Sequence, residues 1–283
     1  MAKLEFDKLI DAGAHFGHLK RKWNPAMAPY IFMERNGIHI IDLYKTIALA
    51  EGAGAALRQV AKSGRKILFV ATKKQAKDVV ATLAKDINMP YVTERWPGGM
   101  LTNFPTIRKA VKKMSTIDKM HKDGTFETLS KRERLQITRQ REKLEKNLGS
   151  IQDLTRLPSA LFVVDIMKET IAVREAQRLG IPVFALVDTN SDPNDVDFVI
   201  PANDDASDSI DAILGYICEE IKEGLQERKA EKGDAAEDAE DQDAAPKRER
   251  KGKATAKKAI AKEDQDAMNA AIASKVAKSE DEE

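Results

Sequence analysis

Three continuous apolar runs, separated by helical patterns, constrain the fold of this 283-residue chain more than any other feature. The runs lie at residues 66–72, 160–165 and 182–188, with helical patterns at about 74–88 and 169–179 between them. Strands that are apolar along their whole length need cover on both faces, and parallel sheets obtain it from the helices that connect their strands. We therefore predict an α/β, doubly wound fold. A last strand at 197–200 and a helix at about 206–225 would complete it.

The N-terminal part predicts a smaller accessory element. A short amphipathic helix is expected at 4–13, and an Ala-rich helix at 44–63 with Gly64 as its cap. Between them, Asn36-Gly37 is flanked by apolar residues at 30–33 and 38–43, which is a strong hairpin signal. Residues 14–29 are predicted to be a loop that carries a basic and aromatic patch. That patch comprises Lys20, Arg21, Lys22 and Trp23.

An insertion at 105–150 interrupts the two α/β halves, which we assign to residues 1–104 and 151–226 of one discontinuous domain. Apolar residues here recur at three-, four- and seven-residue spacings, as in Ile107, Val111 and Met114 and again in Leu144, Leu148 and Ile151. We predict two antiparallel helices that form a projecting coiled-coil hairpin joined near residues 123–125. Its many lysines and arginines would form a basic surface.

The C-terminal segment, residues 227–283, is dominated by Ala, Lys, Glu and Asp with almost no aromatic residues. Such a composition cannot bury enough apolar surface to fold, so we predict a disordered, charged tail.

The net charge of +1 conceals a strong polarity along the chain. Residues 1–156 carry 30 basic and 16 acidic residues, residues 157–226 carry 4 and 14, and residues 227–283 carry 13 and 16. An excess of +14 in the first block favours a polyanionic partner, above all nucleic acid. A single cysteine, Cys218, and the absence of a signal-peptide pattern or of a long apolar span lead us to expect a cytoplasmic protein with no membrane contact.

Residues 95–104 (Arg-Trp-Pro-Gly-Gly-Met-Leu-Thr-Asn-Phe) combine a cation, aromatic rings and two glycines, and contain no nucleophile, histidine or carboxylate. This chemistry suits docking better than catalysis. Arg95 and Trp96 are candidates for RNA contact, although Trp96 could instead brace the loop or simply be buried.

The sequence lacks the motifs that bind nucleotide cofactors. The glycine-rich loop of dinucleotide-binding sheets and the Walker A lysine loop are both missing, since residues 73–75 (Lys-Lys-Gln) follow the first strand. We therefore expect no cofactor and no enzymatic activity. Asp165 and Asp188 close strands and leave one alternative, a flavodoxin-like nucleotide-binding enzyme or phosphoacceptor. Asp188, Asp204 and Asp205 are weak candidates for a metal site, which His15 and His18 could join, but their spacing matches no ligand motif.

Six segments, taken in order, resemble the bacterial small-subunit ribosomal protein S-two family. They are residues 14–18 (Ala-His-Phe-Gly-His), 23–25 (Trp-Asn-Pro), 38–43 (Ile-His-Ile-Ile-Asp-Leu), 95–103, 157–162 (Leu-Pro-Ser-Ala-Leu-Phe) and 188–193 (Asp-Thr-Asn-Ser-Asp-Pro). The resemblance covers residues 1 to about 226. Pro97 departs from it, because the family is expected to have Leu at that position.

The resemblance implies a flavodoxin-like domain with an inserted coiled-coil hairpin and a structural, non-enzymatic role in translation. It implies binding to ribosomal RNA between the head and body of the small subunit, on the solvent side. It also implies contacts with neighbouring ribosomal proteins, among them the messenger-RNA-recruiting protein S-one. The residues that we predict to contact RNA are Lys20, Arg21, Lys22, Trp23, Lys73, Lys74, Arg95, Trp96, Arg108, Lys109, Lys112, Lys113, Arg132 and Arg134.

Overall fold

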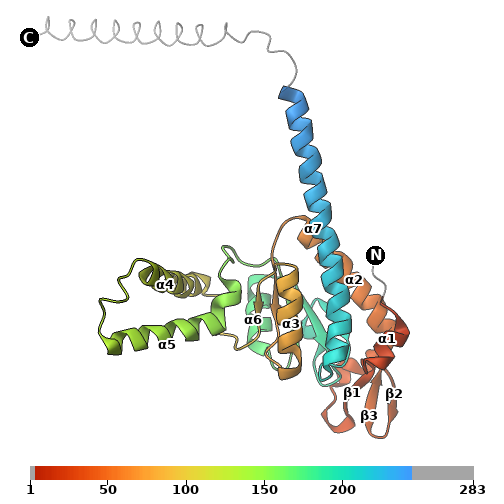
Figure 1. Ribbon diagram of the computed structural model, residues 1–283. Helices are drawn as coiled ribbons and strands as arrows, with labels where there is room; N and C mark the ends of the chain where they lie inside the picture. The colour runs from red at the N-terminus through yellow and green to blue at the C-terminus, as the bar shows by residue number, and fades with distance from the viewer. Residues whose placement is uncertain (1–3, 244–283) are drawn as a thin grey trace, which may run out of the picture. The chain divides into compact units, whose positions relative to one another are not determined.

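The computed structural model describes residues 4–243, and the side chains of these residues up to 231. The chain divides into a compact unit that ends at Ala230 and a second unit that begins at Glu231. The first unit contains a five-stranded sheet, a three-stranded sheet and a pair of helices that extends away from both (Figure 1).

The five-stranded sheet is parallel throughout. Its strands are β4 (Ile67–Val70), β5 (Tyr91–Val92), β6 (Ala160–Val164), β7 (Val183–Val187) and β8 (Phe198–Pro201). They lie in the order β5-β4-β6-β7-β8, so the second strand of the sheet stands outside the first, which is the flavodoxin-like order. Every residue of β4, β6 and β7 is buried, which confirms the prediction drawn from the continuous apolar runs.

Helices cover both faces of this sheet. One face packs on α2 (Leu43–Lys62), α3 (Lys74–Asp86) and α7 (Ser207–Asp243), with Phe69, Phe162 and Phe184 at its centre. The other face packs on α6 (Thr170–Leu179), on the loop that contains Trp96 and on the base of the helical pair. The cap at Gly64 was predicted correctly, since this glycine takes the positive φ that ends α2, and Gly180 does the same after α6.

The three-stranded sheet contains β1 (Phe16–Leu19), β2 (Ile31–Arg35) and β3 (Ile38–Ile41), and α1 (Phe6–Asp11) precedes it. The β2–β3 hairpin turns at Asn36 and Gly37, both with positive φ, as predicted. The prediction of a loop at 14–29 was wrong in part. β1 pairs antiparallel with β3, and two 3₁₀ helices, η1 (Lys20–Lys22) and η2 (Pro25–Tyr30), follow it.

The insertion forms two helices, α4 (Phe104–Lys122) and α5 (Lys131–Leu148), which lie against each other and extend from the sheet (Figure 1). A capping box begins α5, in which Ser130 Oγ accepts from Glu133 N–H and Glu133 accepts from Ser130 N–H. A short 3₁₀ helix, η3 (Gly149–Ile151), returns the chain to the sheet, and η4 (Pro193–Asp195) lies between β7 and β8. Coiled-coil packing of the pair, and its separation as a domain, remain predictions.

The predicted boundary of the tail falls inside α7, because that helix continues to Asp243. Glu227, the first residue of the predicted tail, is bonded to Arg58 of α2 and is therefore part of the folded unit. The rest of the predicted tail, residues 244–283, lies outside the described residues.

Candidate nucleic-acid interface

The α4–α5 pair presents the largest set of exposed cations among the described residues. Ten lysines and arginines of this pair are exposed: Lys109, Lys112, Lys113, Lys119, Lys122, Lys131, Arg132, Arg139, Lys143 and Lys146. The apolar side of α4 is buried instead, through Val111, Met114 and Ile117. The charge is therefore directed to solvent on a pair of helices held at its base by the core.

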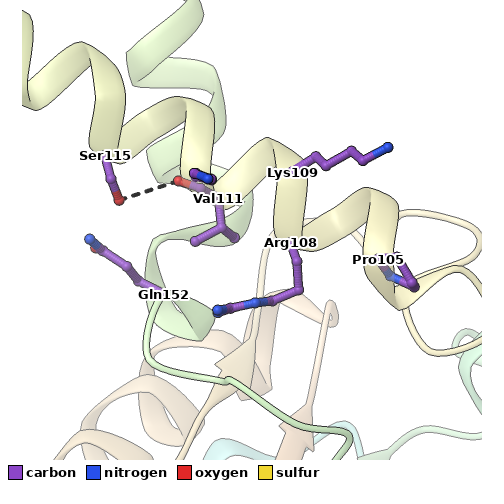
Figure 2. Close-up of a pocket in the computed structure, with 7 residues that line it drawn as sticks. Pro105, Arg108, Lys109, Val111, Ser115 and Gln152 are labelled. Atoms are coloured by element: carbon purple, nitrogen blue, oxygen red, sulfur yellow. Dashed lines mark hydrogen bonds between the residues drawn. The ribbon is translucent and has the colours of Figure 1, made fainter. Parts of the chain in front are cut away.

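A hollow of about 320 Å³ lies beside the first turns of α4 and is lined by Arg108, Lys109, Lys112 and neighbouring residues (Figure 2). Figure 2 shows Lys109 extending outward while Arg108 bends toward the side of Gln152. Arg108 Nη1 donates to the backbone oxygen of Leu154 at 2.9 Å. Arg108 thus ties α4 to the chain after η3, whereas the lysines remain available to an anion.

Two predicted contacts on α5 differ in exposure, since Arg132 is exposed and Arg134 is partly buried. Two cations of the pair form ion pairs within the protein, although the second of them, Lys146, is also one of the ten exposed cations. Arg141 bonds to Asp118 of α4 and to Glu145, and Lys146 Nζ lies 3.3 Å from Glu94.

The 95–104 loop is closed around a carboxylate that we did not predict from the sequence. Glu175 of α6 accepts hydrogen bonds from the backbone N–H groups of Gly99, Leu101 and Thr102, at 2.8, 2.9 and 3.1 Å. Trp96 Nε1–H also donates to Glu175, at 3.2 Å. A clue was present in the sequence, because Glu175 stands on the apolar face of α6 with Ala172, Val173 and Ala176.

This arrangement favours the alternative that Trp96 braces its loop over the prediction that it contacts RNA. Its side chain is buried against the sheet, with 7% exposure, and so it braces the loop from inside. Gly99 takes the positive φ that the turn requires, at +82°. Arg95 is exposed on the outer side of the same loop.

The N-terminal basic patch lies on η1 and the turn after it. Lys20, Arg21 and Lys22 are exposed, although Lys20 Nζ lies 2.7 Å from a carboxylate oxygen of Glu34. Trp23 is partly buried, with its ring centre 5.0 Å from that of His39. The three cations are directed to solvent, and Trp23 packs on the small sheet.

Lys73 and Lys74 have different surroundings although they are adjacent. Lys74 is exposed at the start of α3. Lys73 Nζ instead lies 2.8 Å from Asp204 and 2.5 Å from Asp205, with Asp165 at 3.7 Å. Burial acts to lower the pKa of Lys73, but these carboxylates raise it above its usual value. Lys73 is thus paired within the protein, and its predicted contact with an RNA phosphate stays a prediction.

The carboxylates lie together at the carboxyl edge of the parallel sheet, as their strand-end positions predicted. Asp188 and Asp204 are 1% and 0% exposed. Burial, followed by the charges of Asp188 and Asp165, raises the pKa of Asp204 to about 7. His18 joins this group, with Nδ1 2.9 Å from Asp188 Oδ2. His15 does not join it, and packs against the ring of Phe16.

The strand order of the parallel sheet reverses between β4 and β6. At the carboxyl ends of these two strands, the side chain of Glu169 occupies the space where related folds bind a ligand. Glu169 accepts from the backbone N–H of Thr72 at 2.9 Å and also from the Thr72 hydroxyl. The Glu169 side chain is buried, and this burial raises its pKa above the usual value. In flavodoxin-like sheets a cofactor phosphate binds at this position and needs free N–H or O–H donors. Here the donors of Thr72 are already bonded to Glu169.

Comparison with known proteins identifies close relatives. A family model described as ribosomal protein S2 matches residues 9–224. A protein of Parabacteroides distasonis is 72% identical over 282 residues, which cover 99% of this chain and all of the relative. A protein of Phocaeicola vulgatus is 68% identical over the full length of both chains. One of Flavobacterium johnsoniae is 71% identical over 238 residues, 84% of this chain and 94% of the relative. All three are described as small ribosomal subunit protein uS2.

Proposed function

Because the chain belongs to the ribosomal protein S2 family, we propose that it is a structural constituent of the small ribosomal subunit that binds ribosomal RNA. The observation that carries the RNA contact is the row of exposed cations on α4 and α5. Cations held on a projecting pair of helices can neutralise successive phosphates, which dominate the affinity of proteins for nucleic acid.

The family is structural and non-enzymatic. This overturns the alternative of an enzyme or phosphoacceptor that uses Asp165 or Asp188. The geometry agrees with this conclusion. A carboxylate that accepts a phosphoryl group must be accessible to the phosphoryl donor, whereas Asp188 is only 1% exposed.

The proposed RNA surface consists of exposed cations from four places in the fold. Lys109, Lys112 and Lys113 on α4 form its centre. Arg21 and Lys22 on η1, Lys74 at the start of α3 and Arg95 in the loop after β5 extend it. We place this surface against ribosomal RNA between the head and body of the subunit, on its solvent side, as expected for the family. The protein would accordingly act in the cytoplasm. No helix in the part of the chain that the structure describes is long and apolar enough to cross a membrane.

An exposed apolar surface formed by α1, the small sheet and the start of α2 supports a contact with a protein neighbour, and S-one is the neighbour that we propose. Phe32 and Tyr44 are 71% and 72% exposed. With Phe6 and Ile10 they line a hollow of about 200 Å³. Exposed apolar patches of this kind commonly mark protein contacts. Phe32→Glu should therefore lower the amount of S-one recovered with purified small subunits, without lowering the amount of this protein in them.

Sedimentation of a tagged copy through sucrose gradients tests the RNA surface. The wild-type protein should comigrate with small subunits at low salt. The triple variant Lys109→Glu, Lys112→Glu, Lys113→Glu should be recovered mainly in the light fractions, because six units of charge change on one face oppose the phosphates. Arg108 is left intact, since its bond to Leu154 gives it a structural role.

A matched control carries the same charge change elsewhere, in Lys8→Glu, Lys66→Glu, Lys85→Glu, three exposed lysines outside the proposed surface. It should stay with the subunits. Equal incorporation of the two triple variants would reject α4 as the RNA-binding face. A wild-type protein that sediments free of RNA at both low and high salt would reject the ribosomal role itself.

A further inference from the structure

A hollow of about 520 Å³, the interhelical hollow, lies between α4, α5 and the 95–104 loop. From α5 it takes Gln140, Lys143, Leu144 and Asn147, whose spacings of three, four and seven place them on one face of that helix. We propose that this hollow binds one unpaired nucleotide of ribosomal RNA, with its base inserted between the helices. The inference rests on the proposed RNA-binding function and adds a base contact to its phosphate contacts.

Part of the lining is apolar and suits the flat face of a base. Ile107 and Ala110 of α4 and Leu144 of α5 line the interhelical hollow, and all three are partly buried against the core that contains Trp96. Covering one face of an unpaired base with such side chains removes apolar surface from water. The guanidinium plane of Arg95 can stack on a base in the same hollow.

The polar side chains of the interhelical hollow are available to a ligand. The amides of Gln140 and Asn147 and the cationic groups of Arg95 and Lys143 have no hydrogen-bond or ion-pair partner among the described residues. Arg141 of the same helix is instead paired with an acidic residue of α4. Amides both donate to and accept from the edges of bases, and cations bind the flanking phosphates. The free groups are therefore those that a nucleotide needs.

Charge and position favour RNA as the occupant. Among the described residues that line the interhelical hollow none is acidic, and its two cations, Arg95 and Lys143, are exposed. Arg95 also belongs to the proposed RNA surface. An RNA strand held on that surface by its phosphates would thus pass the opening of the hollow. Single-stranded loops and bulges offer unstacked bases to sites of this kind.

Gly98 allows the interhelical hollow to be filled without a change of charge. It lines the hollow, its φ is not positive, and a Cβ at this position would meet nothing within 4 Å. Gly98→Leu in the full-length protein should lower the affinity for small-subunit ribosomal RNA by about fivefold to a hundredfold, the range expected for one lost base contact. The salt dependence of the affinity should not change, because no phosphate contact is lost.

Gly52→Leu is the matched control for this substitution. Gly52 is an exposed glycine of α2, outside the interhelical hollow, and a Cβ there would also meet nothing within 4 Å. This control should bind the RNA as the wild type does. Filter binding at several salt concentrations measures both the affinity and its salt dependence.

A second variant leaves the apolar lining intact. Gln140→Ala combined with Asn147→Ala removes both amides and should lower the affinity at least about threefold, since each hydrogen bond contributes a factor of about 2–10. Gln59→Ala combined with Gln226→Ala removes two exposed amides outside the interhelical hollow and should have no effect.

Modification of the RNA with dimethyl sulfate and a carbodiimide locates the bound base. The wild-type protein should protect an unpaired nucleotide that both hollow variants leave reactive and both controls protect. Unchanged affinity and unchanged modification in the two folded hollow variants would overturn this inference, and an acidic protein segment as the true occupant would give that result. The RNA surface itself would stand in that case, provided that the triple lysine variant of α4 still loses the RNA. A wild-type protein that does not bind the RNA would overturn both proposals.

Discussion

Trp96 Nε1–H donates to Glu175 Oε1 at 3.2 Å, which joins the indole of a surface loop to a carboxylate on α6. The same carboxylate accepts three backbone N–H groups from the loop. The composition of the 95–104 loop suggests a docking surface, but its conformation is held by the buried carboxylate of Glu175. Its exposed part, including Arg95, is positioned by buried hydrogen bonds rather than by packing alone.

Replacing Glu175 with Gln should destabilise the fold by about 2–4 kcal/mol. Both carboxylate oxygens accept hydrogen bonds, and the amide NH₂ group of Gln would face N–H donors on one side. Urea unfolding followed by circular dichroism measures the loss. Arg174→Gln on the exposed face of α6 serves as the control and should change stability by no more than about 0.5 kcal/mol. A Glu175→Gln variant as stable as this control would show that the hydrogen bonds to Glu175 contribute little.

Acid should remove this same stabilisation. Burial acts to raise the pKa of Glu175, but hydrogen bonds from Thr102, Leu101, Gly99 and Trp96 outweigh it and lower the pKa below the usual 4.5. A lowered pKa in the folded state stabilises the protein above the unfolded-state value, and this contribution is lost as the pH falls through the folded-state pKa. The difference in unfolding free energy between wild type and Glu175→Gln should be constant from pH 7 to about 5 and shrink below about 4.3. A difference that stays constant down to pH 3 would contradict this assignment.

The parts of the fold that the sequence predicted are those encoded locally. β4, β6 and β7 are apolar at each position, and the Asn36-Gly37 pair favours a turn wherever it occurs. β1 was missed because its four residues, Phe16–Leu19, include a glycine and a histidine and form a strand only through pairing with β3. Local propensity carries no information about such a partner.

The sequence predicted that the candidate site is basic, but it did not predict which of its side chains face solvent. The basic excess correctly indicated which half of the chain carries the exposed cations. Whether Lys73 or Lys74 faces solvent depends on Asp204, which lies 131 residues away in the sequence. The burial of Trp96 depends in the same way on Glu175, 79 residues away. Long-range partners of this kind are visible only once the helices and strands are packed.

Gly17 should tolerate no side chain, because β1 passes very close to the loop after β7. A Cβ at this position would lie 2.6 Å from Thr189 Cγ2 and 3.0 Å from the backbone oxygen of His39. Gly17→Ala should cost about 1–3 kcal/mol, measured by urea unfolding. Thr189→Ser should restore part of the loss, since it removes Cγ2. Gly52→Ala is the control, because its Cβ would meet nothing within 4 Å and alanine is the better helix former.

Lys73 and Lys74 provide a test of where RNA binds, since the two are adjacent but face different surroundings. The association constant K for small-subunit ribosomal RNA falls with salt, so a plot of log K against log salt has a negative slope. Lys74→Gln should make this slope less steep by about 0.7–0.9, as expected for one lost phosphate contact. Lys73→Gln should leave that slope unchanged. It should instead destabilise the protein by about 1–3 kcal/mol, because it leaves the buried Asp204 without its cation. Filter binding at several salt concentrations, together with urea unfolding, separates the two effects. A reduced slope for Lys73→Gln would show that this lysine leaves the carboxylates to reach the RNA.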